Sequence, residues 1–174
     1  TPTNTPVAPT STPVPPTATP IPPTSTPKPL PANPATLYAV ADTYTTSMDA
    51  TSAAGGSATV LRINARGSDT TFLRFDLSAL AGKTITDATL RVHTSADSWS
   101  GTAVTANVNL VASTDWSESY MSLNNTVPIS STVLGSIAPP LASNTWYDIS
   151  LTPSLVQPQA GGLMSMALNL SATD

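Results

Sequence analysis

The sequence contains no cysteine, a single histidine and a single glutamate, and only 9% of its residues are charged. The absence of cysteine excludes disulfide bonds, thiolate catalysis and metals held by sulfur. The six basic side chains are scattered and do not form the clusters that neutralise phosphates. No stretch approaches the roughly 20 apolar residues that a membrane-spanning helix needs. The sequence therefore predicts neither nucleic-acid binding nor a membrane span.

Groups that could catalyse a reaction are equally scarce. His93 lies at the end of an apolar run, and no nucleophile or second histidine is available to complete a site, so we interpret it as a surface residue. A glycosidase needs two opposed carboxylates, whereas Glu118 is the only glutamate and, near Trp116, is expected to cap a turn or pair with an arginine. We predict no enzymatic activity, no catalytic residue, no metal site and no cofactor. One alternative is a structural calcium ion held by three aspartates that lack a recognised loop motif: Asp42, Asp49 and Asp69.

Proline, in contrast, is abundant, and 13 of its 18 residues precede residue 37. Residues 10–30 form three heptads of the template Thr-x-Thr-Pro-x-Pro-x, and residues 3–9 fit the same register. Each proline fixes φ near about −65° and favours extended geometry in the residue before it. Residues 1–36 are therefore predicted to be a stiff polyproline-II-like segment that reaches about 110 Å. Residues 37–174 are long enough for one globular domain.

The threonines of the proline-rich segment need a separate explanation. Exposed hydroxyl groups beside proline are typical of O-glycosylated stalks, with a bare linker as the alternative. The glycosylation candidates are the repeat threonines: Thr3, Thr5, Thr10, Thr12, Thr17, Thr19, Thr24 and Thr26. Because the chain begins without methionine, we expect a processed protein or one unit of a longer chain. A composition rich in threonine, serine and asparagine favours an extracellular location.

Residues 37–174 show the pattern of an all-β domain. Short runs alternate between apolar and polar residues, are separated by Gly, Ser, Asn and Pro, and never sustain a helical period. The expected strands are Leu37–Tyr44, Thr59–Ile63, Thr71–Leu77, Thr84–His93, Val104–Val111, Trp146–Leu151 and Leu163–Leu170. Seven or eight short strands predict a β-sandwich or jelly roll.

Four segments carry a recognisable pattern: ADTY (Ala41–Tyr44), FLRFDLSALAGKTITDATLRV (Phe72–Val92), DWSESYMSLNN (Asp115–Asn125) and WYDI (Trp146–Ile149). Over residues 41–170 the chain resembles the DNRLRE-type β-sandwich domains. These are extracellular bacterial modules related to a carbohydrate-binding module family found on alginate-active enzymes. The resemblance implies a bacterial, cell-surface or secreted domain, with acidic polysaccharide as a candidate partner.

Two features depart from that family. Ser122-Leu123 stands where the family tends to have Thr-Trp, and such domains usually end with one more strand than this sequence supplies. A missing strand would leave a sheet edge unpaired, and an unpaired edge is a template for another chain.

Trp99 is the carbohydrate-binding candidate. It lies in the polar segment SADSWSG, where an indole could stack on a sugar ring, although it could also fold back over the rim of the sandwich. We interpret Trp116 and Trp146 as core or edge-packing residues. Arg74 and Asp76 share one face of a strand, and we interpret them as an ion pair that fixes the register.

Two functions fit these observations. The first is an extracellular structural protein, a repeating subunit of a glycosylated cell-surface filament that assembles with copies of itself through contacts between the sandwich and extended segments of neighbours. The alternative is a non-catalytic carbohydrate-binding module tethered by a linker to a secreted polysaccharide-degrading enzyme. Polymeric purified material would favour the first, and retention on acidic polysaccharide the second.

Overall fold

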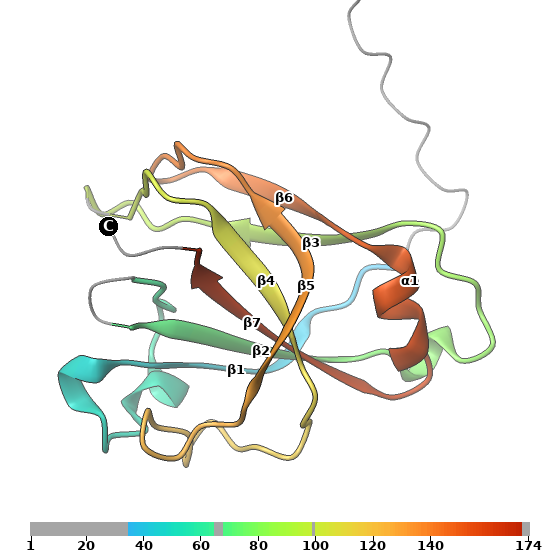
Figure 1. Cartoon of the computed structure of the whole chain (residues 1–174), viewed down its shortest axis with the longest axis horizontal. Helices are drawn as coiled ribbons and strands as arrows, with labels where there is room; N and C mark the ends of the chain where they lie inside the picture. Colours follow the sequence, from blue (N-terminus) through green and yellow to red (C-terminus); the bar gives the residue numbers. More distant parts are fainter. Residues whose placement is uncertain (1–34, 65–67, 99, 172–174) are drawn as a thin grey trace, which may run out of the picture. The chain divides into compact units, whose positions relative to one another are not determined.

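The computed structural model describes residues 35–64, 68–98 and 100–171. Trp99 and residues 1–34, which hold all eight threonine candidates, lie outside the described residues. Within the described part, the strands form two antiparallel sheets packed face to face (Figure 1). The predicted all-β sandwich is therefore confirmed.

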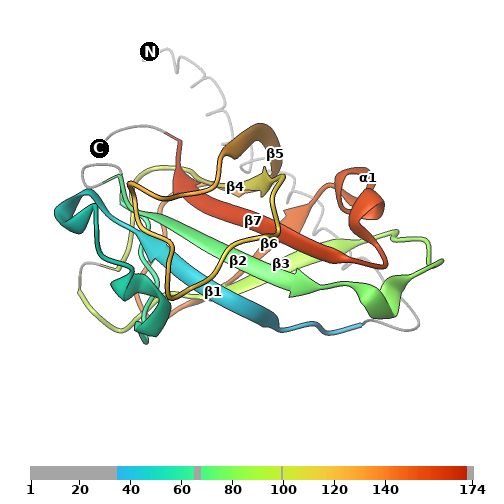
Figure 2. The same ribbon diagram turned by 90° about the horizontal axis from the view of Figure 1, so that it is seen from below.

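The larger sheet has five strands in the order β1-β2-β7-β4-β5. Their bounds are β1 (Ala39–Thr45), β2 (Thr70–Asp76), β7 (Leu163–Leu170), β4 (Ala106–Val111) and β5 (Ile129–Ile137). Every neighbouring pair is antiparallel, and Figure 2 shows β1, β2 and β7 lying side by side. Strands close in sequence often lie in different sheets, which is typical of a sandwich with crossover connections.

The smaller sheet consists of β3 (Ala88–His93) and β6 (Trp146–Leu151). The edge of β6 that faces away from β3 lies close to β5. Just after β6, the Thr152 N–H donates to the Leu134 carbonyl of β5 at 2.7 Å. A Cβ on Gly135 would overlap the Ser150 carbonyl oxygen, so this close approach requires glycine. In the described part of the chain, β3 has backbone hydrogen bonds to β6 alone.

The main core fills the space between the two sheets. Its most deeply buried members come from both sheets, namely Val108, Leu134, Ile149 and Met164. A second cluster covers the opposite face of the larger sheet and contains Ala41, Phe72, Val111, Trp116, Met121 and Ala167. The larger sheet is thus buried on both faces, and loop residues 112–128 supply part of its outer cover.

Two parts of the fold differ most from the sequence prediction, and the strand predicted at Thr84–His93 begins only at Ala88. Residues 59–63 do not form a strand, and in that region only Asn64 makes a bridge, to Asp69. Leu61 and Ile63 still pack against the main core, so their apolar character reflects burial without strand pairing. Strand β5 was not predicted, because the four apolar residues of its sequence ISSTVLGSI do not alternate with the polar ones, and only one residue of the strand is fully buried.

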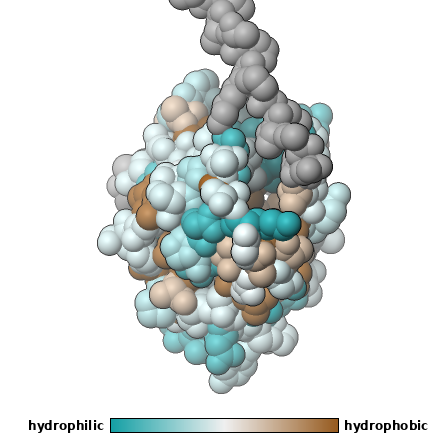
Figure 3. Space-filling view, turned by 90° about the vertical axis from the view of Figure 1, so that its right-hand side faces the viewer, coloured by the Kyte–Doolittle hydropathy of each residue, from teal (hydrophilic) through white to brown (hydrophobic). Residues whose placement is uncertain are grey.

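The connection from β6 to β7 forms a short helix, α1 (Pro153–Val156), followed by the 3₁₀ turn η4 (Gln157–Gln159). Proline at the first helical position is preorganised for a helix start. The side chain of Gln157 accepts the Ile85 N–H at 2.7 Å and donates to the Lys83 carbonyl at 3.0 Å, which ties this end to the loop before β3. Figure 3 shows this end, where polar residues separate smaller apolar areas. Among the described residues, no helix is long and apolar enough to cross a membrane.

Candidate functional site

The outward surface of the smaller sheet carries a cluster of polar and aromatic side chains. Because side chains alternate along a strand, Leu90 and Ile149 point into the core. Their neighbours therefore point to solvent, and four of them form what we call the outer face: Arg91, His93, Trp146 and Asp148. The indole of Trp146 is 59% exposed, which is unusual for a residue of that size.

The outer face is organised around Trp146. Cross-strand pairing places His93 opposite Trp146 and Arg91 opposite Asp148. The His93 and Trp146 ring centroids are 4.8 Å apart, and the Arg91 guanidinium lies 5.1 Å from the Trp146 ring centroid. Arg91 Nε also lies 3.3 Å from Asp148 Oδ1. The arrangement combines a flat apolar ring with a cation, an anion and an imidazole.

The backbone beside Trp146 is held by hydrogen bonds at the end of the strand pair. The Thr94 hydroxyl accepts the Thr145 N–H at 2.9 Å, and the Thr94 N–H donates to the Thr145 carbonyl at 3.0 Å. The Tyr147 hydroxyl accepts the Ala142 N–H at 2.6 Å. The backbone that carries Trp146 is therefore fixed, and little backbone ordering entropy is lost when a ligand contacts the indole.

The structure agrees with the sequence interpretation for some of the three tryptophans and not for others. Trp116 is buried in the second cluster, as predicted. Trp146 is not a core residue, so that part of the interpretation was wrong: it begins β6 with its side chain on the solvent side of a sheet that has no further layer over it in the described residues. Its contacts with His93 and Arg91 are compatible with the other part, an edge-packing residue. Trp99 lies outside the described residues. His93 is exposed at the end of β3, as expected.

Arg74, on β2, binds the loop that contains Thr114 and Trp116 to the larger sheet. Its Nη1 donates to the carbonyl oxygens of Thr114 and Trp116 at 2.9 and 2.8 Å, and its guanidinium lies 4.8 Å from the Trp116 ring centroid. The Trp116 indole N–H donates in turn to the Ser165 hydroxyl at 3.0 Å. These contacts replace the predicted ion pair with Asp76, whose carboxylate accepts the Ser78 N–H at 2.8 Å.

Glu118 protects the outer edge of β1. Its carboxylate accepts the Asp42 N–H at 2.6 Å, so Glu118 has a structural role as a strand-edge acceptor in place of the predicted turn cap or arginine partner. Next along the edge, the 3₁₀ turn η2 (Ala54–Ser57) brings Gly55 against Tyr44, where a Cβ would overlap the Tyr44 carbonyl oxygen. Edge strands invite pairing with other chains unless they are covered, and this one is covered from Asp42 to Tyr44.

Burial and the nearby Glu118 carboxylate raise the pKa of Asp42. A carboxyl group whose pKa is higher in the folded than in the unfolded chain contributes stability at low pH, and loses it as the pH rises through the folded pKa. We expect Asp42→Asn to raise the free energy of unfolding at pH 7 by less than about 0.5 kcal/mol, and the melting temperature to rise slightly with it. Below the pKa of the unfolded chain, the substitution should bring no gain.

Asp76→Asn is the matched control, because hydrogen bonds from Ser78 lower the pKa of Asp76. Its carboxylate contributes stability that is lost as the pH falls, so this substitution should lower the melting temperature at pH 7. Thermal denaturation at pH 3 and pH 7 checks both variants. If the melting temperature at pH 7 changed in the same direction in both variants, the opposite pKa shifts of Asp42 and Asp76 would be contradicted.

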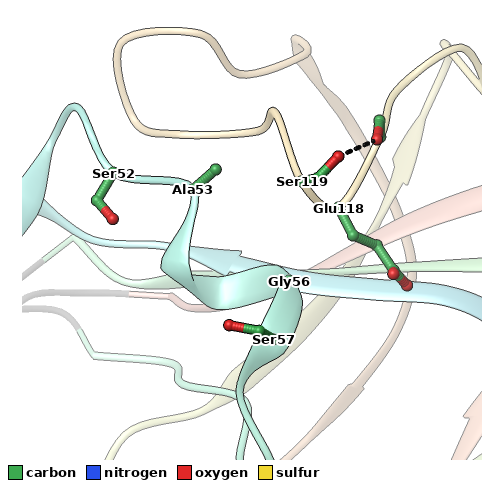
Figure 4. Close-up of a pocket in the computed structure, with 7 residues that line it drawn as sticks. Ser52, Ala53, Gly56, Ser57, Glu118 and Ser119 are labelled. Carbon is green, nitrogen blue, oxygen red and sulfur yellow. Dashed lines mark hydrogen bonds between the residues drawn. The ribbon is translucent and has the colours of Figure 1, made fainter.

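A pocket of about 430 Å³ lies between η2 and the turn that follows Trp116 (Figure 4). Its walls are formed mainly by small polar residues, and we call it the serine pocket: Ser52, Ala53, Gly56, Ser57, Ser117, Glu118 and Ser119. A Cβ on Gly56 would overlap the Glu118 carbonyl oxygen, so glycine allows the two walls to meet.

The three aspartates considered for calcium do not converge. Asp49 Oδ1 accepts from the Thr51 hydroxyl and the Ser52 N–H, and Asp69 is buried in the bridge to Asn64. In the part of the chain that the structure describes, no three acidic, histidine or cysteine side chains are grouped closely enough to hold a metal ion. Calcium binding stays an untested alternative.

The sequence model of carbohydrate-binding module family 96 matches residues 33–174. The chain belongs to this family. Comparison with curated proteins gives no match. Membership in family 96 supports the second of the two functions inferred from the sequence, a carbohydrate-binding module, and is compatible with the prediction of no enzymatic activity. It gives no support for a filament, and the DNRLRE type and the Pro/Thr stalk stay predictions.

Proposed function

We propose that this family 96 domain binds a polysaccharide chain along the outer face of the β3–β6 sheet, with Trp146 stacked against a sugar ring. The observation that supports this most strongly is the exposure of Trp146 among hydrogen-bonding side chains on the outer face. Amphipathic aromatic side chains suit ligands that are apolar on one side and polar at the edge. A pyranose ring has an apolar face of C–H groups and a rim of hydroxyls.

The charges on the outer face favour acidic sugars. The Arg91 and Asp148 side chains are 65% and 61% exposed, and an ion pair so accessible to water contributes little stability. Arg91 can therefore exchange Asp148 for a uronate carboxylate, which a guanidinium binds in a bidentate manner. Asp148 and His93 remain available to hydroxyl groups. We propose an acidic polysaccharide as the ligand class.

The wider setting follows from the same proposal. The domain acts without catalysis as the anchoring part of a secreted or cell-surface bacterial protein, and residues 1–36 link it to a polysaccharide-degrading enzyme. Assembly with copies of itself finds no support at β1, since Glu118 and η2 cover that edge. The edge of β3 is the place where a partner strand would add under the filament hypothesis.

Titration calorimetry with an oligouronate and with a neutral oligoglucan tests the ligand class. Arg91→Gln should weaken oligouronate binding about tenfold, because one charge-assisted contact is lost, and should change binding of the neutral glucan by less than about twofold. Arg62→Gln is the matched control, since Arg62 also lies over an aromatic ring, at 5.4 Å from the Tyr44 centroid. Equal effects of the two substitutions would refute the assignment of Arg91.

A further inference from the structure

The serine pocket is separate from the outer face in both position and chemistry. It lies beside the edge of the larger sheet, where η2 and Glu118 cover β1, whereas Trp146 lies on the smaller sheet. Its volume of about 430 Å³ falls within the range of small-molecule sites, roughly 300–1,000 Å³. Figure 4 shows Ala53 and Ser119 on opposite walls, with the Glu118 side chain pointing away from Ala53 and down toward β1.

The walls of the pocket are held in place by the fold. The Ser117 and Ser119 hydroxyls are 3.0 Å apart in a hydrogen bond, and the Tyr120 and Met121 N–H groups donate to the Ser117 carbonyl. Met121 is buried in the second cluster, and the two carbonyl bonds from Arg74 fix the chain just before this turn. The opposite wall is fixed by the packing of Gly56 against Glu118.

The pocket lining offers many hydroxyl groups and one carboxylate. A serine hydroxyl has one donor and two acceptor positions, so the four serines keep some capacity for a ligand even where they are already bonded, as the Ser117 and Ser119 hydroxyls are to each other. The Glu118 carboxylate has about four acceptor sites, of which the Asp42 N–H uses one. Ala53 and Gly56 leave room between these groups. Tyr120 continues the same turn with a side chain that is 73% exposed. Polar groups of this kind recognise a ligand that carries several hydroxyls.

We infer that the serine pocket is a second glycan-binding site, which takes one neutral sugar residue. The negative charge of Glu118, with Asp42 beside it, repels a uronate, whereas neutral hydroxyls donate to the carboxylate. The two sites therefore select different sugars: the outer face prefers acidic residues, and the serine pocket prefers neutral ones. A domain with two such sites binds mixed polysaccharides with an avidity that neither site reaches alone.

Amide chemical shifts measured by NMR during titration with methyl glycosides of glucose, galactose and mannose test this inference. At least one glycoside, at millimolar concentration, should shift amides of residues 52–57 and 117–120 in the wild type and equally in Trp146→Ala. Methyl glucuronide should shift them at least about tenfold more weakly. Shifts confined to the outer face, or absent for all three neutral glycosides, would overturn the second site and leave the proposed function of the outer face intact.

Two variants connect such shifts to the pocket. Ala53→Leu fills the space and should abolish the shifts, while Ala103→Leu, at an exposed alanine outside the pocket, should leave them unchanged. Ser119→Ala removes one hydroxyl and should weaken binding about two- to tenfold. Unchanged binding in both Ala53→Leu and Ser119→Ala would also refute the inference. The amide spectrum of the rest of the domain shows that each variant is folded.

Discussion

Trp146→Ala is expected to weaken polysaccharide binding about thirtyfold, which corresponds to about 2 kcal/mol for the loss of a central aromatic contact. The indole provides the flat apolar area of the outer face, and the neighbouring groups are too polar to replace it. Stability should change little, because the side chain is 59% exposed and lies outside both core clusters. Calorimetry with an oligouronate measures the affinity, and thermal denaturation measures the stability.

Tyr38→Ala is the matched control for this substitution. Tyr38 is more exposed than Trp146, at 82%, but it precedes β1 in the larger sheet and has no ring or cation partner in the described residues. Its replacement should leave the affinity within about twofold of the wild type. If both variants lost the same affinity, any exposed aromatic side chain would contribute to binding, and the outer face would not be a specific site. An unchanged affinity in Trp146→Ala would place the glycan elsewhere on the domain.

The fold could be predicted from the sequence wherever burial imposes a clear period. Strands β6 and β7 lie where alternation predicted them, because their inward residues pack between the sheets. Residues 59–63 show the same alternation without strand pairing, since Leu61 and Ile63 reach the core from a loop. Alternation reports which side chains are buried and leaves open whether the backbone finds a partner.

The candidate site was harder to predict for a related reason. Trp146 begins the alternating run WYDISL, and large aromatic residues in such runs are on average highly buried. A signal was nevertheless present: Ile149 and Leu151 have the opposite parity to Trp146 and Asp148, so an inward Ile149 places Trp146 outward. The partners of Trp146 could not be found this way, because the register between β3 and β6 is a property of the folded sheet.

Arg74→Ala should lower the free energy of unfolding by about 3 kcal/mol. The substitution removes two charge-assisted hydrogen bonds to the carbonyl oxygens of Thr114 and Trp116, together with the contact between the guanidinium and the Trp116 ring. A hydrogen bond to a charged group contributes about 1.5–3 kcal/mol, and the carbonyls left behind recover only part of this from water. Chemical denaturation measures the loss, and the melting temperature should fall by about 10 °C.

Arg91→Ala is the matched control, because Arg91 also lies over a tryptophan ring, as Arg74 does, but on an exposed surface. The comparison shows whether the loss of stability depends on the buried hydrogen bonds of Arg74. Arg91 stands over Trp146 on the exposed face and pairs with Asp148 in water, so its removal should reduce stability by less than about 1 kcal/mol. Arg74→Lys should retain part of the stability, since an ammonium can donate to carbonyl oxygens but has no planar group to stack on the Trp116 ring. If Arg74→Ala and Arg91→Ala were equally stable, the loop that carries Trp116 and Glu118 would be held by apolar packing and by the hydrogen bonds of these two residues to Ser165 and Asp42. The edge of β1 and the serine pocket would then not depend on Arg74.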